Sequence, residues 1–128
     1  MKNIVITGST RGIGFGLANA FLERDCTVTI SGRTQAAVDR AIHELAAHHT
    51  PNNIFGLPCD VNDFAQVQAL WDAAKSHFGS VDVWINNAGI ANEPMNFWQH
   101  DPDEYSRVIN TNIVGTMNGC KVAMTGML

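Results

Sequence analysis

The feature that most constrains the fold is an alternation of short β-branched runs with longer amphipathic stretches. The short runs are near-continuous in apolar and β-branched residues, as strands buried on both faces are: residues 3–7, 27–31, 53–59 and 81–85. The stretches between them, residues 13–24, 35–48 and 63–78, repeat apolar residues at helical spacing. Strands joined by helical crossovers pair in parallel. The sequence therefore predicts an α/β fold, a doubly wound parallel sheet with helices on both faces and strand order 3-2-1-4.

The sequence contains fewer strands than a complete doubly wound fold requires. A loop spans residues 87–100, Pro102 suits the first turn of a helix, and the helical pattern then continues to Leu128. Doubly wound sheets are built from two halves, and these 128 residues supply about one half plus a helix. We therefore expect residues 1–128 to form a Rossmann-like dinucleotide-binding domain, truncated after about four strands and incomplete at its C-terminus.

Composition excludes several classes of function. The net charge is −4 with only 8 Lys+Arg, which argues against nucleic-acid binding. No apolar run approaches the roughly 20 residues of a membrane helix, so no membrane span is expected. The three cysteines form no CxxC pair and the histidines show no ligand spacing, so we expect no metal site. Few and scattered cysteines favour a reducing, cytoplasmic location.

The loop after the first predicted strand is rich in glycine and opens the first helix. Glycine lets a backbone approach a phosphate closely, and a helix N-terminus offers free N–H groups to it. No Gly-Lys-Ser/Thr follows, so a P-loop is excluded. The predicted phosphate-binding residues are Gly8, Ser9, Thr10, Arg11, Gly12, Ile13 and Gly14.

Two motifs in register resemble the short-chain dehydrogenase/reductase family. They are Thr7-Gly8-x-x-x-Gly12-x-Gly14 after the first strand and Asn86-Asn87-Ala88-Gly89 after the fourth. The resemblance covers essentially the whole chain, and within the family residues 82–89 are most similar to the chlorophyll b reductase-like members. It implies an oxidoreductase that passes a hydride between a nicotinamide cofactor and a small carbonyl or alcohol substrate.

The same resemblance assigns roles to residues at the ends of the third and fourth strands. Asp60 would contact the adenine amino group, with Val61 beside the ring. Asn87 would line the cofactor's ribose, and Asn112 would shape the active site and its proton-relay water. The implied cofactor-binding residues in these segments are Asp60, Val61, Asn87, Ala88 and Gly89, and the implied catalytic residue is Asn112.

The end of the second strand discriminates between NAD and NADP. A carboxylate there would accept hydrogen bonds from the ribose 2′-OH, whereas arginine accommodates a 2′-phosphate. In this sequence Gly32 stands where the family would carry the acid, and Arg33 follows it. Arg11 in the glycine loop is placed to approach the same phosphate. The two arginines and the absence of an acid predict NADP(H) as the cofactor.

This sequence lacks the catalytic residues that the family uses. The resemblance implies a serine and a Tyr-x-x-x-Lys, but the only tyrosine is Tyr105, and Ile109 stands four residues later. We therefore expect an NADP-dependent enzyme as the intact protein and an inactive chain 1–128. The alternative is a non-catalytic nucleotide-binding or interaction module whose short length is native. A methyltransferase is disfavoured by the glycine spacing. Because the predicted strand 81–85 is apolar and unpaired on one side, we expect a homo-oligomer.

Overall fold

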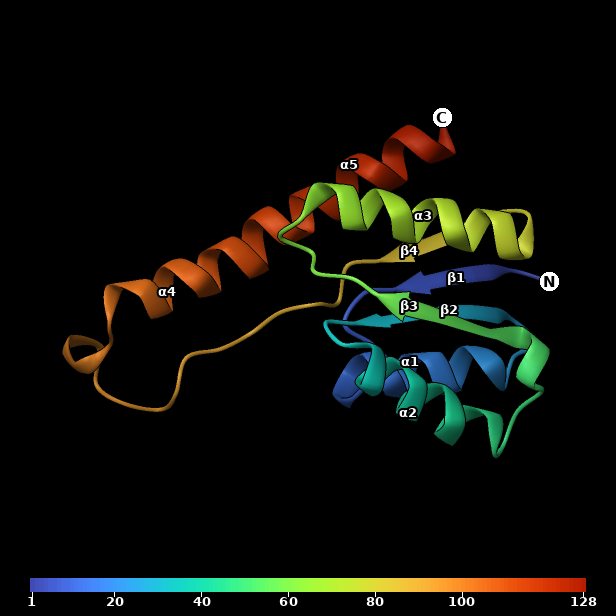
Figure 1. Ribbon diagram of the computed structural model, residues 1–128, viewed down its shortest axis with the longest axis horizontal. Helices are drawn as coiled ribbons and strands as arrows, with labels where there is room; N and C mark the ends of the chain where they lie inside the picture. Colours follow the sequence, from blue (N-terminus) through green and yellow to red (C-terminus); the bar gives the residue numbers. More distant parts are fainter.

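The structure, a computed structural model, describes residues 1–128 as one four-stranded parallel sheet in the order β3-β2-β1-β4 (Figure 1). The strands are β1 (Asn3–Ile6), β2 (Thr27–Gly32), β3 (Ile54–Pro58) and β4 (Val83–Ile85). The helices are α1 (Gly12–Leu22), α2 (Gln35–Ala46), α3 (Phe64–Phe78), α4 (Pro102–Ile109) and α5 (Gly115–Met127). The predicted α/β class, parallel pairing and strand order are confirmed. No helix of the described chain is long and apolar enough to cross a bilayer.

Helices cover both faces of the sheet, with α1 and α2 on one side and α3 and α5 on the other (Figure 1). Residues of β1 alternate between these two layers, because successive side chains in a strand point to opposite faces. Ile4 and Ile6 belong to the apolar cluster beneath α1 and α2, and Val5 belongs to the cluster that includes Trp71 of α3 and Val122 of α5. Both faces of β1 are therefore buried, which is why its sequence reads as a continuous apolar run.

Local sequence signals set the ends of α2 and α3. The Thr34 side chain accepts a hydrogen bond from the Ala37 N–H at 3.2 Å, and the Asp63 side chain accepts one from the Ala65 N–H at 3.0 Å. These caps satisfy N–H groups that have no partner within the helix. Gly79 ends α3 with a φ of +88°, in the left-handed region that favours glycine. Asp63 and Gly79 thus set the two ends of α3.

Strand β4 begins at Val83, so it is shorter than the predicted strand of residues 81–85. The Asp82 carboxylate accepts hydrogen bonds from the Asn3 N–H at 2.8 Å and from the Ser80 hydroxyl at 3.3 Å. The bond from the Asn3 N–H is the main reason why the pKa of Asp82 lies below its ordinary value. Asp82 therefore bonds to the start of β1.

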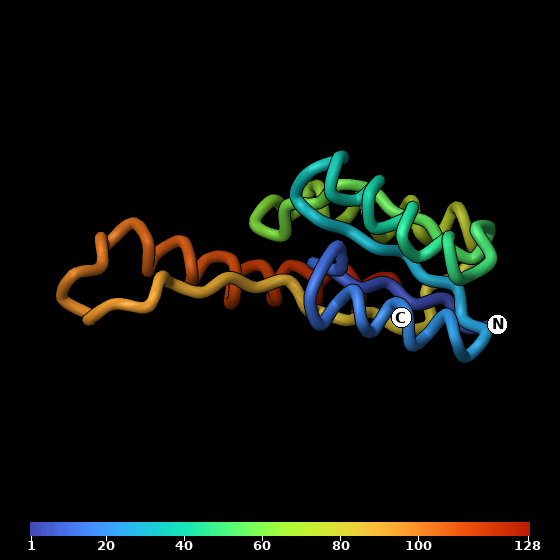
Figure 2. Tube along the Cα trace, turned by 90° about the horizontal axis from the view of Figure 1, so that it is seen from below, coloured from blue at the N-terminus to red at the C-terminus, as the bar shows by residue number.

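Helices α4 and α5 form one continuous rod through a π-helical turn at Asn110–Val114, which we call the π-turn. Figures 1 and 2 show α4 and the loop before it extending beyond the sheet, whereas α5 packs beside α3. π-helical turns inside α-helices are rare and occur frequently at functional sites. The π-turn contains Thr111 and Asn112, and both contact loops at the carboxyl ends of the strands.

Candidate functional site

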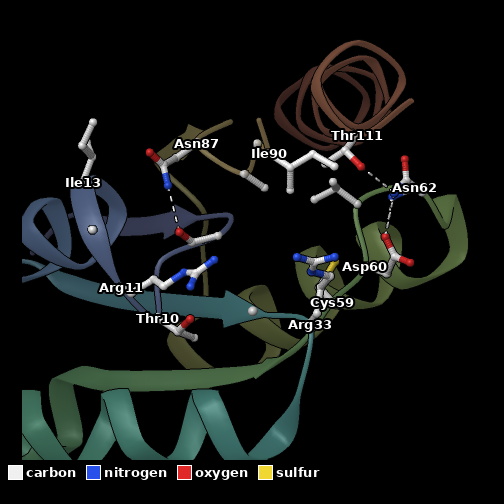
Figure 3. Close-up of a pocket in the computed structure, with 16 residues that line it drawn as sticks. Thr10, Arg11, Ile13, Arg33, Cys59, Asp60, Asn62, Asn87, Ile90 and Thr111 are labelled. Carbon is white, nitrogen blue, oxygen red and sulfur yellow. Dashed lines mark hydrogen bonds between the residues drawn. The ribbon is translucent and has the colours of Figure 1, made fainter. Parts of the chain in front are cut away.

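A pocket of about 310 Å³ lies at the carboxyl ends of the strands, where doubly wound sheets bind their ligands. The loops after all four strands contribute to its walls (Figure 3). It brings together all but two of the predicted cofactor-binding residues. These are Gly8, Thr10, Arg11, Gly12, Ile13, Arg33, Asp60, Val61, Asn87, Ala88 and Gly89.

The two exceptions, Ser9 and Gly14, support the loop from behind and do not line the pocket. Ser9 is fully buried, and its hydroxyl donates to the Ile6 carbonyl at 2.6 Å and accepts from the Ser31 N–H at 3.0 Å. Gly14 is buried in the first turn of α1, where a Cβ would overlap the Asn87 side-chain nitrogen. The sequence motif did not separate these supporting residues from those that face a ligand.

The glycine loop and the Asn86–Gly89 segment are joined by a network of hydrogen bonds. The Asn87 amide donates to the carbonyl oxygens of Thr7 and Gly8 at 3.1 and 2.9 Å. The Thr7 hydroxyl oxygen accepts from the backbone N–H groups of Asn87 and Ala88, both at 3.1 Å. Gly8 has a φ of +61°, and a Cβ there would lie 2.7 Å from the Ala88 Cα. The close approach of the two loops therefore requires glycine at position 8.

The pocket presents positive electrostatic groups on the side of β1 and β2. The N-terminus of α1 opens at Gly12, and its first turn carries no acidic residue. Arg11 and Arg33 are both exposed, and neither forms a salt bridge. Figure 3 shows their guanidinium groups directed into the pocket. Free N–H groups at a helix N-terminus and unpaired arginines together favour a phosphate-bearing ligand.

The opposite wall is the loop after β3, which is bonded to the rod formed by α4 and α5. The Asn62 amide donates to the Asp60 carboxylate at 3.2 Å and to the Thr111 hydroxyl at 3.1 Å (Figure 3). Asn118 in α5 donates to the Val61 carbonyl at 2.8 Å. The π-turn and α5 thus fix the position of Asp60 and Val61 beside the pocket.

The pocket is also lined by Gly32, which the sequence analysis used to discriminate between NAD and NADP, and by four residues that it missed: Cys59, Asn62, Ile90 and Thr111. Each of them adjoins a predicted residue in the chain, Thr111 through Asn112, so extending each motif by one residue would have found them. Thr111 also contacts the opposite wall, because its hydroxyl accepts a hydrogen bond from the Asn62 amide. No group of three or more His, Cys, Asp or Glu side chains is arranged as a metal site.

Asn112 does not line the pocket but holds its rim. Its side-chain oxygen accepts from the Ile90 N–H, and its side-chain nitrogen donates to the Ile90 carbonyl, both at 2.8 Å. These two bonds fix the chain directly after Gly89. In this structure Asn112 therefore acts as a positioning residue, and its expected catalytic role stays a prediction.

Cys59 lies against the same pocket but has the wrong chemistry for a nucleophile. Burial, followed by the charges of Asp60 and Asp63, raises the pKa of its thiol to about 11. A thiol with so high a pKa is almost wholly protonated at neutral pH, and the thiolate is the reactive form. Cys59 is therefore an apolar part of the wall.

A glycine loop, a helix N-terminus and a pocket at the carboxyl ends of a parallel sheet define the class: a Rossmann-type domain. The sequence model of the family described as short chain dehydrogenase matches residues 2–128. The chain belongs to this family, which confirms the resemblance carried by its two motifs.

Two relatives of this chain are named for different substrates. A 3alpha-hydroxysteroid dehydrogenase of Mediterraneibacter gnavus is 34% identical over 122 residues, which are 95% of this chain and 48% of that protein. The chloroplastic chlorophyll(ide) b reductase NOL of Oryza sativa subsp. japonica is 35% identical over an alignment of 131 positions, which covers 98% of this chain and 37% of that protein. The chain thus spans half or less of the length of these relatives.

Solved structures agree in fold. ElxO with NADP bound has a TM-score of 0.88 at 35% identity, and the match covers 98% of this chain and 50% of ElxO. The 3-ketoacyl-(acyl-carrier-protein) reductase from Brucella melitensis, complexed with NADH, has a TM-score of 0.88 at 30% identity and covers 98% of this chain and 49% of the reductase. The family therefore includes close structural neighbours bound to either nicotinamide dinucleotide.

Proposed function

We propose that residues 1–128 are the NADP(H)-binding part of an oxidoreductase that interconverts a carbonyl and an alcohol. The proposed cofactor preference rests on Arg11 and Arg33, which line the same pocket. It also rests on the glycine at position 32, where an acid would favour NAD. A solved relative at 35% identity holds NADP, which supports the same choice.

The residues of the pocket fit a dinucleotide. The N-terminus of α1 and the backbone at Gly8 and Gly12 would hold the pyrophosphate, and the two arginines would hold a 2′-phosphate. Asp60 and Val61 would face the adenine. When bound, the nicotinamide supplies or accepts the hydride. The part of this chain in the reaction is to bind and orient the cofactor, with Asn112 fixing the Ile90 segment beside it.

Calorimetric titration of the chain with NADPH and with NADH tests the proposal. We expect NADPH to bind more tightly by about tenfold or more, because a charge-assisted contact to the 2′-phosphate is worth about 1.5–3 kcal/mol. Equal affinity for the two dinucleotides would remove the argument from the arginines. Binding of neither would favour the alternative, an interaction module without a cofactor.

We expect the chain 1–128 to bind NADPH without reducing carbonyl compounds. The only tyrosine, Tyr105, stacks on Phe97 at a ring-centroid distance of 5.9 Å, on the α4 segment that extends away from the sheet (Figure 2). Ile109 stands four residues later, where the family's motif would place the lysine. Oxidation of NADPH in the presence of small ketones and aldehydes, followed by absorbance, measures this. Turnover that is lost in the Tyr105→Phe variant would make Tyr105 a true proton donor and contradict the expectation.

We further propose that copies of this chain associate. Strand β4 pairs only with β1, so its outer edge offers unpaired N–H and C=O groups. Apolar side chains recur along one side of the rod formed by α4 and α5: Ile109, Ile113, Met117 and Met124 are each more than half exposed. Sedimentation at micromolar concentration should therefore show dimers or larger species. A stable monomer of 13.9 kDa would contradict this.

The substrate and the location follow from the family only in outline. A small carbonyl or alcohol is the proposed substrate, and the named relatives act on molecules as different as hydroxysteroids and chlorophyll(ide) b. Because the rice relative is chloroplastic, the cytoplasmic location expected from the cysteines stays a prediction.

A further inference from the structure

Position 32, at the end of β2, is closed to any side chain by Thr10 of the glycine loop. A Cβ built on Gly32 would lie 2.6 Å from Thr10 Cγ2, 3.0 Å from Thr10 Oγ1 and 3.4 Å from Thr10 Cβ. The φ of Gly32 is not positive, so its backbone conformation would accept an ordinary L-residue. The three atoms nearest to such a Cβ thus all belong to the Thr10 side chain.

The backbone beneath Thr10 cannot easily withdraw. The Ser9 N–H donates to the Ser31 carbonyl at 2.8 Å, and the Ser31 N–H donates to the Ser9 hydroxyl at 3.0 Å. The Ser9 hydroxyl in turn donates to the Ile6 carbonyl at 2.6 Å. These buried bonds fix the glycine loop to both β1 and β2. Relief of a collision at position 32 must therefore come from the Thr10 side chain.

Rotation of Thr10 relieves the collision only in part. A β-branched side chain places two heavy atoms in three staggered positions, so at least one of the two positions near Gly32 is always filled. The better of these arrangements still leaves a contact near 3.0 Å. Alanine at position 10 would leave only its Cβ, at the ordinary distance of 3.4 Å. Valine has the branched shape of threonine and would keep the collision.

We propose that Thr10 is a specificity-determining residue for the cofactor, because it keeps position 32 free of a carboxylate. This rests on the proposed NADP(H) function. An acid at position 32 would accept hydrogen bonds from a ribose 2′-OH and repel a 2′-phosphate. While Thr10 is present, such an acid must crowd the Thr10 side chain, which belongs to the loop proposed to hold the pyrophosphate. Cofactor preference in this chain is therefore set jointly by positions 10 and 32.

The steric part can be tested without any cofactor. Gly32→Ala is introduced into the unsubstituted chain, the Thr10→Ala variant and the Thr10→Val variant, and urea unfolding midpoints are compared. We expect Gly32→Ala to lower the midpoint in the unsubstituted chain and in the Thr10→Val variant, and to leave it unchanged or raised in the Thr10→Ala variant. Equal changes in all three backgrounds would show that Thr10 does not close position 32 and would overturn the proposal.

The specificity part compares Gly32→Asp alone, Thr10→Ala alone, and the two together, by calorimetry with NADH and NADPH. Gly32→Asp alone should weaken both dinucleotides. The pair should shift the preference toward NADH by about tenfold or more relative to Thr10→Ala alone, the scale of one charge-assisted contact. A shift equally large with Thr10 intact would overturn the coupling. If the unsubstituted chain binds neither dinucleotide, the proposed function fails, and the unfolding comparison still decides whether the collision exists.

Discussion

Gly14→Ala should abolish detectable cofactor binding and lower the free energy of unfolding by about 3 kcal/mol. A Cβ at position 14 would overlap the Asn87 side-chain nitrogen and would lie 2.6 Å from the Gly8 carbonyl oxygen. Overpacking of this kind costs about 1–3 kcal/mol, and each hydrogen bond that Asn87 then loses adds about 1 kcal/mol. The Asn87 bonds to Thr7 and Gly8 hold the glycine loop against the fourth strand's loop, so the pocket itself should lose its shape.

Gly16→Ala is the matched control, since it makes the same change two residues later in α1. Nothing lies within 4 Å of a Cβ at position 16, and this residue is exposed. Alanine is a better helix former than glycine by about 1 kcal/mol, so this variant should be more stable and bind cofactor as before. Urea unfolding and calorimetry on both variants decide the matter. Similar stability losses in the two would mean that helix propensity, and not the contact with Asn87, governs position 14.

The fold was largely predictable because its information is local. Continuous apolar strands, helical spacing between them, and signals such as Asp63 and Gly79 each act within a few residues of the chain. The exception is β4, where the predicted strand included Val81 and Asp82 but the observed strand begins at Val83. Asp82 bonds to Asn3 across the sheet and precedes the strand. That contact joins residues 79 positions apart, and no local pattern shows it.

The sequence predicted most of the residues that line the pocket, but not what each of their side chains contacts. The motifs brought the correct loops together, because strand ends of a parallel sheet meet at one edge. They could not show that Ser9 points into the core, or that Asn112 bonds to Ile90. They also could not show that Thr111, next to the predicted Asn112, bonds to Asn62. Side-chain direction in a loop depends on tertiary contacts, which sequence spacing does not contain.

Arg33→Ala should weaken NADPH binding by about 1–3 kcal/mol, the scale of a lost charge-assisted contact, and leave NADH nearly unchanged. Arg33 is exposed at the pocket and has no ion-pair partner, so its removal leaves no buried charge behind and should not unfold the chain. Arg33→Lys keeps the charge but loses the planar guanidinium group that suits a phosphate. Its affinity for NADPH should lie between those of the unsubstituted chain and the Arg33→Ala variant.

Arg40→Ala provides the control for net charge, because Arg40 is exposed on α2 and does not line the pocket. It removes the same positive charge and should change neither affinity beyond a small effect of screening. Calorimetry with both dinucleotides on all three variants measures the difference. An equal loss for NADPH and NADH in Arg33→Ala would mean that Arg33 contacts a group the two cofactors share. The 2′-phosphate would then have to be held by Arg11 alone, the other arginine of the pocket.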